Sequence, residues 1–135
     1  MEECILTIAE VSKKYDITAD TLRYYERIGL IPAVLRKPNG IRDYDQASCQ
    51  WVELMKCMRK AGVQIEALIE YVALFRQGDE TMDARKTILI EQRKRLVRKM
   101  QDMQETLERL DYKIEMYEQG KMTSDYQLHI KDCQK

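Results

Sequence analysis

Hydrophobic and polar positions alternate at helical spacing along most of the chain, in segments of unequal length. Thr7 and Glu10 form a capping-box pattern where an apolar stripe begins, which predicts a short helix over residues 8–14. Thr18 is positioned to cap a second helix, which ends before Gly29 at a site that favours a left-handed residue. The pattern therefore predicts two short helices joined by a tight turn.

The middle of the chain predicts a small hairpin followed by a helical pair. Residues 33–44 contain Pro38-Asn39-Gly40 between two strand-compatible segments, which is typical of a β-hairpin. Asp45 can cap the next helix, which carries apolar residues on one face up to Gly62. These residues are Ala47, Trp51, Leu54, Met55 and Met58. A further amphipathic helix follows before Gly78.

A long helix is predicted from Thr81 to about Gln119, a stretch that contains neither Gly nor Pro. Its apolar residues repeat every seven positions, which is typical of a coiled coil. The first seam comprises Met82, Leu89, Leu96, Met103, Leu110 and Tyr117, and the second adds Met100, Leu107 and Ile114. Burial of these side chains outweighs the cost of association, which predicts a homodimer.

Charges in the seam favour one direction of pairing. In a parallel homodimer Lys86 would face Lys86 and Arg93 would face Arg93, and these like charges would repel. An antiparallel pairing centred near Met100 brings the same cations toward acidic residues in the second half of the partner helix. Those acidic residues are Glu108, Glu115 and Glu118. We therefore expect an antiparallel coiled coil.

Composition agrees with a mainly helical protein and directs attention to the location of charge. The 135 residues include only five Gly and two Pro, and 23 basic residues balance 23 acidic ones. Residues 13–42 differ, because seven Lys or Arg stand against three Asp or Glu and give a local charge of +4. The apolar runs are too short to span a membrane and no basic leader precedes them, so we expect a cytoplasmic protein.

The two short helices and the hairpin carry a sequence that resembles one family. The pattern consists of Thr21-Leu22-Arg23-Tyr24-Tyr25-Glu26-Arg27-Ile28-Gly29-Leu30-Ile31-Pro32, followed by Asn39-Gly40-Ile41-Arg42-Asp43-Tyr44. It resembles the MerR family of bacterial transcription regulators, and the resemblance covers nearly all of residues 5–119. It implies a mainly α fold, in four parts. These are a winged helix-turn-helix DNA-binding head (1–44), a helical pair completing it (45–78), a dimerisation coiled-coil helix (79–119) and a flexible tail (120–135).

The resemblance also implies which residues meet DNA. Arg23 and Tyr24 of the second helix, with Arg42 and Tyr44 near the hairpin, would face the duplex. Four further residues would lie close enough to touch phosphates: Thr18, Thr21, Arg36 and Lys37. Basic side chains neutralise phosphates, while Tyr and Thr hydroxyls donate to phosphate oxygens, so the chemistry agrees. Two structural alternatives stand beside these roles: Thr18 as a helix cap, and Tyr25 as a core residue.

One cysteine is a candidate sensor. On the helix after Asp45, Cys49 points away from the apolar stripe and is expected to be exposed, whereas Cys57 falls at the edge of the stripe. Cations bracket Cys57 and favour a reactive thiolate; they are Lys56, Arg59 and Lys60. The alternative is that Cys57 only packs as a small hydrophobe. Residues 49–62 resemble the aldehyde-responsive (AdhR/NmlR-like) branch, which implies that Cys57 senses a small electrophile such as formaldehyde or methylglyoxal.

Other functions are less well supported by the sequence. No role is implied for Cys4, Cys49 or Cys133, and neither a metal site nor a cofactor is expected. The resemblance implies action with RNA polymerase at a promoter operator, through distortion of the double-stranded DNA. The alternatives are the same fold with a non-covalent or redox effector, or a coiled-coil adaptor that binds protein. An enzyme is disfavoured, because the chain has one His, no paired carboxylates in an apolar setting and no Gly-rich phosphate loop.

Overall fold

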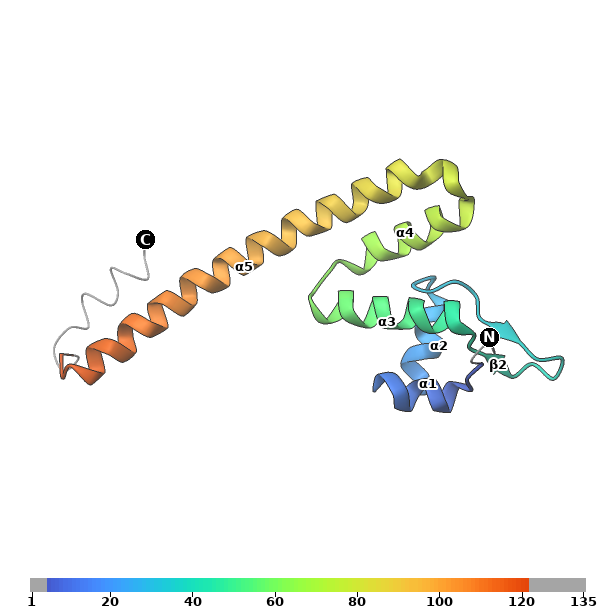
Figure 1. Cartoon of the computed structure of the whole chain (residues 1–135), viewed down its shortest axis with the longest axis horizontal. Helices are drawn as coiled ribbons and strands as arrows, with labels where there is room; N and C mark the ends of the chain where they lie inside the picture. Colours follow the sequence, from blue (N-terminus) through green and yellow to red (C-terminus); the bar gives the residue numbers. More distant parts are fainter. Residues whose placement is uncertain (1–4, 122–135) are drawn as a thin grey trace. The chain divides into compact units, whose positions relative to one another are not determined.

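The computed structural model describes residues 5–121, which are mainly helical with one small antiparallel hairpin (Figure 1). The elements are α1 (Ile8–Tyr15), α2 (Ala19–Arg27), β1 (Leu35–Arg36), β2 (Arg42–Asp43), α3 (Gln46–Lys60), α4 (Ile65–Gln77), the 3-10 turn η1 (Asp79–Thr81) and α5 (Met82–Glu118). The predicted order and type of elements is confirmed. Cys4, Cys133 and nearly all of the tail predicted for residues 120–135 lie outside the described residues.

Contacts divide the chain into two compact units, Met1–Lys94 and Arg95–Lys135. We call the described part of the first unit the head (residues 5–94) and the α5 segment of the second the rod (residues 95–118). Buried side chains from residues 5–44 and from residues 45–78, such as Leu22 and Val52, share one cluster.

Polar side chains cap the amino ends of the first three helices of the head, as the sequence predicts. Thr7 and Glu10 form the complete capping box, in which Glu10 N–H donates to Thr7 Oγ1 (3.2 Å) and Thr7 N–H donates to Glu10 Oε1 (2.9 Å). These hydrogen bonds hold the pKa of Glu10 below its ordinary value. Thr18 caps α2 by accepting from Thr21 N–H (3.1 Å), and Asp45 caps α3 in the same way.

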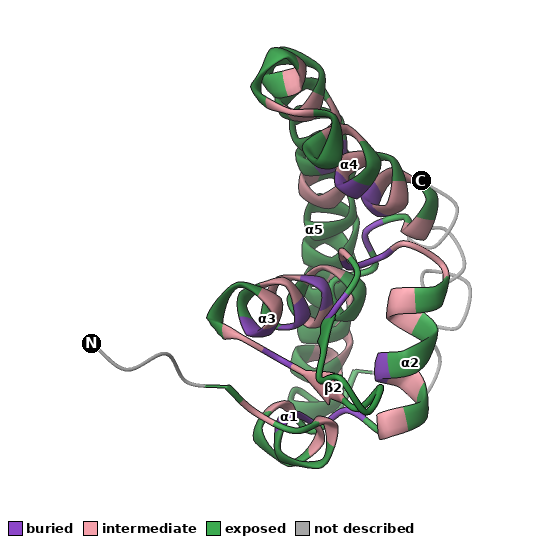
Figure 2. Cartoon of the chain, turned by 90° about the vertical axis from the view of Figure 1, so that its right-hand side faces the viewer, coloured by how far each residue is buried: buried purple, intermediate pink, exposed green. Residues whose placement is uncertain are grey.

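The core of the head is one cluster of buried side chains that come from α1, α2, α3, α4 and their connections, and the buried positions are purple in Figure 2. Its fully buried members include Val11, Leu22, Leu30, Ile31, Val52, Met55 and Val72. Two of these, Leu30 and Ile31, come from the connection after α2, where Gly29 takes the left-handed conformation (φ 81°) that the sequence predicts. The turn at Gly29 thereby directs the chain back across the core toward the hairpin.

The expectation that Cys49 is exposed was wrong, because α3 is covered on two sides. Cys49 is only 7% exposed, and its thiol approaches the carbonyl oxygen of Tyr44 (3.9 Å). The Trp51 side of the helix packs on α4 instead, with the Trp51 ring edge-on to Phe75 at a centroid distance of 4.9 Å. A single apolar stripe accounts for only one of these two contact surfaces.

The hairpin forms a short wing beside α2. Leu35 pairs with Asp43 and Arg36 with Arg42, and Leu6 pairs with Tyr44 in an isolated antiparallel bridge at its base. Gly40 adopts φ 86° in the turn, and its N–H donates to the Lys37 carbonyl (2.8 Å). Arg36 and Lys37 therefore lie where β1 enters the tight exposed loop that joins the two strands.

Helix α5 begins within the head, and its buried residue is polar, unlike those of the other helices. Gln92 is its buried residue, and its side-chain amide accepts a hydrogen bond from the backbone N–H of Gln64 and donates one to Gln64 Oε1, both at 3.3 Å. Gln92 Oε1 accepts from Gln64 N–H, so α5 supplies the cap that the amino end of α4 lacks. Among the described residues, no helix is both long and apolar enough to cross a bilayer.

Candidate nucleic-acid interface

Two threonine hydroxyls define the start of α2. Thr18 Oγ1 accepts from Thr21 N–H and donates to Thr21 Oγ1 (2.8 Å), so the two side chains are held together. Thr18 therefore caps α2, as the sequence predicts. Thr18 is also exposed and Thr21 half-exposed, which leaves both oxygens near the surface at the positive end of the helix dipole.

The exposed face of α2 presents cationic and aromatic side chains. Arg23 pairs with Asp20 (2.8 Å), and the side chain of Asp20 is 95% exposed. Tyr24 is 41% exposed, and the Arg27 guanidinium lies 5.4 Å from the centroid of its ring. Tyr25 is half-buried and packs against the core, as its alternative role predicts. Consecutive tyrosines thus divide between surface and core.

Three basic residues lie in the wing. Arg36 is exposed and donates from Nη1 to the Gly40 carbonyl (3.0 Å), which braces the loop. Lys37 is exposed and its Nζ lies 3.7 Å from the Asp43 carboxylate. Arg42 is more enclosed, with a side chain that is 21% exposed. Together with Arg23, these residues give the α2 and wing segment its excess of positive charge.

Glu26 joins α2 to the wing, a role that the sequence analysis missed. Its Oε1 accepts from Arg42 Nε (2.7 Å) and lies 3.7 Å from Arg36 Nη2, while its Oε2 accepts from Val34 N–H (2.7 Å). Burial raises the pKa of Glu26, but the hydrogen bonds from Arg42 and Val34 and the nearby positive charges outweigh burial and hold that pKa below its ordinary value. A signal existed, because Glu26 stands four residues after the buried Leu22 and so on the same helical face.

The assignment of Tyr44 to the DNA-facing surface was wrong. Its side chain is 0% exposed, and its hydroxyl has no hydrogen-bond partner among the described residues. Burial raises the pKa of Tyr44 above its ordinary value. Its backbone exchanges two hydrogen bonds with Leu6 (2.8 Å each), which fixes the base of the wing. Tyr44 therefore helps to hold the base of the wing in place.

Cys57 lies apart from these residues, in the last turns of α3. It is a free, exposed thiol, in agreement with the accessibility that a sensor requires. Two of the cations that bracket it in sequence are turned to backbone carbonyls, since Lys56 donates to Tyr15 O and Arg59 donates to Val63 O (2.7 Å). Lys60 is exposed. Two of the three cations near Cys57 therefore also make structural hydrogen bonds with the backbone.

Comparison with known proteins agrees with this architecture. Residues 7–44 match the family model described as MerR family regulatory protein. The HTH-type transcriptional regulator AdhR of Bacillus subtilis (strain 168) is 59% identical over 92 residues, which are 68% of this chain and 66% of AdhR, just under two thirds of its length. More than half of the aligned residues are thus identical to those of a transcriptional regulator.

Solved structures extend the likeness to almost the whole chain. A putative MerR family transcriptional regulator from Listeria monocytogenes is 44% identical, covers 96% of each chain and superposes with a TM-score of 0.83. HiNmlR, described as a MerR family regulator lacking the sensor domain and bound to promoter DNA, is 28% identical over 89% of this chain and 95% of its own, with a TM-score of 0.78. The chain belongs to the MerR family of DNA-binding transcriptional regulators.

Proposed function

We propose that two copies of the chain bind a promoter operator through α2 and the wing. The proposed contacts with the duplex come from one surface of the head: Thr18, Thr21, Arg23, Tyr24, Arg36, Lys37 and Arg42. The observation that carries this proposal is the gathering of exposed cations on α2 and on the adjoining wing, which Glu26 ties together. Phosphate contacts of this kind position a protein on DNA, and side chains of α2 would read base edges.

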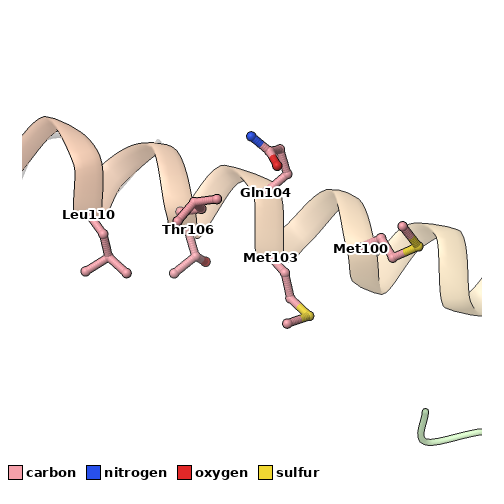
Figure 3. A pocket seen from close by; sticks show the side chains of 6 residues that line it. Met100, Met103, Gln104, Thr106 and Leu110 are labelled. Carbon is pink, nitrogen blue, oxygen red and sulfur yellow. The ribbon is translucent and has the colours of Figure 1, made fainter.

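The proposed homodimer is supported by the apolar surface of α5. Eight of its nine seam residues are exposed, from 40% at Leu89 to 71% at Met103, whereas a folded chain would be expected to cover such side chains. Figure 3 shows Met103 and Leu110 on the same side of the helix, in a shallow apolar hollow. A second copy offers the same residues and would cover both seams at once.

The charge of α5 supports an antiparallel arrangement. Residues 82–101 carry seven Lys or Arg and two Asp or Glu, a charge of +5. Residues 102–118 carry two basic and six acidic residues, a charge of −4. An antiparallel pair sets each positive half beside a negative half, while a parallel pair would set like charges side by side.

The proposed effector is a small electrophile that adds to Cys57. In this reaction the Cys57 sulfur bonds to the carbonyl carbon of formaldehyde or methylglyoxal, and the carbonyl oxygen takes up the proton, giving a hemithioacetal with no leaving group. The accessibility of the Cys57 thiol supports this role. The adduct would shift the dimer between two DNA-bound states, one of which lets RNA polymerase engage the promoter.

The experiment compares the parent, Cys57→Ala and Cys57→Ser proteins in transcription reactions with RNA polymerase, with and without aldehyde. We expect about tenfold induction for the parent, equivalent to about 1.4 kcal/mol between the two states, and none for either variant. DNA binding without aldehyde should be the same in all three. Induction of Cys57→Ser to the parental level would contradict the thiol mechanism. Intact-mass analysis then separates an adduct from oxidation or a non-covalent effector.

A further inference from the structure

Glu26 is an acidic residue held between α2 and the wing, the two segments whose side chains are proposed to contact DNA. Carboxylates repel phosphates, and the other acidic residue of α2, Asp20, extends into solvent with a side chain that is 95% exposed. The Glu26 side chain is 12% exposed and is directed at the wing. Its desolvation has to be compensated, and three groups of the wing segment supply the compensation.

The three groups belong to different parts of the wing. Val34 N–H precedes β1, Arg36 lies in β1 and Arg42 lies in β2. A two-stranded hairpin is only marginally stable by itself, so its direction depends on such anchors. The two oxygens of one carboxylate thus fix both strands of the wing to the helix that carries Arg23 and Tyr24.

We propose that Glu26 is a positioning residue for sequence-specific DNA binding, which holds Arg36 and Arg42 in one geometry relative to α2 and so favours the operator over unrelated DNA. This inference rests on the proposed contacts of the two wing arginines with the duplex. Glu26 binds Arg42 through Nε, which is one of five guanidinium donors. The remaining donors can reach a phosphate while the carboxylate keeps the guanidinium plane oriented.

The same carboxylate lowers the attraction to DNA of any sequence. Its negative charge offsets one of the two wing arginines, so each head presents one positive charge fewer to a duplex on which the wing does not fit. Non-specific binding depends on the number of phosphates that are neutralised, whereas operator binding also depends on where the cations lie. Glu26 therefore lowers the affinity for DNA of any sequence and raises the preference for the operator.

The test measures binding to a short duplex that the parent protein has enriched from a random-sequence pool, and to poly(dI–dC). For Glu26→Gln we expect the ratio of operator to poly(dI–dC) affinity to fall about tenfold. Binding to poly(dI–dC) should strengthen, and its salt dependence should steepen by roughly 2 for a dimer that gains two positive charges. Glu66→Gln makes the same charge change at an exposed position of α4 and should keep the parental ratio and slope.

A second variant separates orientation from charge and from folding. Arg42→Lys retains the positive charge but lacks the planar guanidinium and its Nε contact, so its ratio should fall as it does in Glu26→Gln. A parental ratio in Arg42→Lys, with thermal melting showing a folded head, would overturn the inference. Equal effects of Glu26→Gln in the parent and in an Arg42→Ala background would also overturn it, because Glu26 is expected to act through Arg42.

The outcomes also distinguish this inference from the proposed function. If neither Arg36→Ala nor Arg42→Ala weakens operator binding, the proposed wing contacts are wrong. If both weaken it while Glu26→Gln leaves the affinity ratio unchanged, the contacts are right and the positioning role of Glu26 is wrong.

Discussion

The head and the rod use their apolar residues in opposite ways. In the head, Leu22, Met55 and Val72 are at most 1% exposed and share one core. In the rod, Leu107 and Leu110 are 49% and 53% exposed, although they are the same kind of side chain. A helix in isolation buries little of its apolar surface, since its stability in proteins comes from tertiary packing. The comparison indicates that the head folds on its own contacts, whereas the rod is expected to need a partner to cover its apolar side chains.

The strongest way to test this comparison is to charge the rod. Leu107→Glu combined with Leu110→Glu would replace four leucines in the seam of a dimer with carboxylates. The lost apolar contacts and the desolvation of the carboxylates outweigh their attraction to the partner's positive half, so we expect a monomer. Loss of the second head removes the avidity of two linked half-sites, and operator affinity should fall roughly 10²- to 10⁴-fold. Analytical ultracentrifugation and a binding titration measure the two effects.

A matched charge change shows whether the position in the seam matters. Gln101→Glu adds one negative charge per chain, half of the change in the double variant, to the exposed surface of α5 outside the two seams, and it should leave the protein dimeric. The helical content of the head should survive in the double variant, because its core residues are untouched. A dimeric double variant would show that the apolar surface of the rod is not the interface.

The second test concerns the core of the head. Leu22→Ala removes a fully buried side chain, and we expect the free energy of unfolding to fall by about 2 to 5 kcal/mol. Leu35→Ala makes the same chemical change at a position that is 62% exposed, and its effect should stay within about 0.5 kcal/mol. Thermal unfolding at a fixed protomer concentration compares the two. Similar losses would mean that the head is not organised around this core.

Local patterns were sufficient to predict the helices of both regions. Thr7, Thr18 and Asp45 each provide a side-chain cap that is read from neighbouring residues alone, and the structure contains all three. The long α5 helix followed from its heptad repeat. Its dimeric pairing stays a prediction, because the exposed seam defines a surface without defining what covers it.

The residues that sequence reasoning misplaced depend on contacts between distant segments. Tyr44 is buried because its backbone pairs with Leu6, thirty-eight positions earlier, which no local pattern indicates. Cys49 is buried because α3 packs on both sides, while one apolar stripe was assumed. The resemblance placed the proposed contacts on α2 and the wing, but the role of Glu26 required knowledge of where the wing lies.

The smallest expected effect is the dependence of head stability on acid pH. The folded head holds the pKa of Glu26 below its ordinary value of 4.5, so the charged carboxylate stabilises the fold. A carboxyl group whose pKa is lower in the folded than in the unfolded protein stabilises the fold at pH values above its unfolded pKa. This stabilisation is lost as the pH falls through its folded pKa. The parent should therefore exceed Glu26→Gln by on the order of 1 kcal/mol at neutral pH, and the difference should shrink below about pH 4.5.

Arg42→Met tests whether the pH effect has the cause assigned to it. Burial opposes ionisation of Glu26, and the groups that favour it are the Arg42 guanidinium, Val34 N–H and, more weakly, Arg36; Tyr44 is the other titratable group nearby. Removing Arg42 deletes the largest favourable contribution, so acid should destabilise Arg42→Met less than the parent over the same pH range. Melting temperatures measured from neutral pH down to the acid limit of folding provide the comparison. Equal acid sensitivity in the two proteins would mean that other carboxylates, such as Glu10 in its capping box, dominate the response.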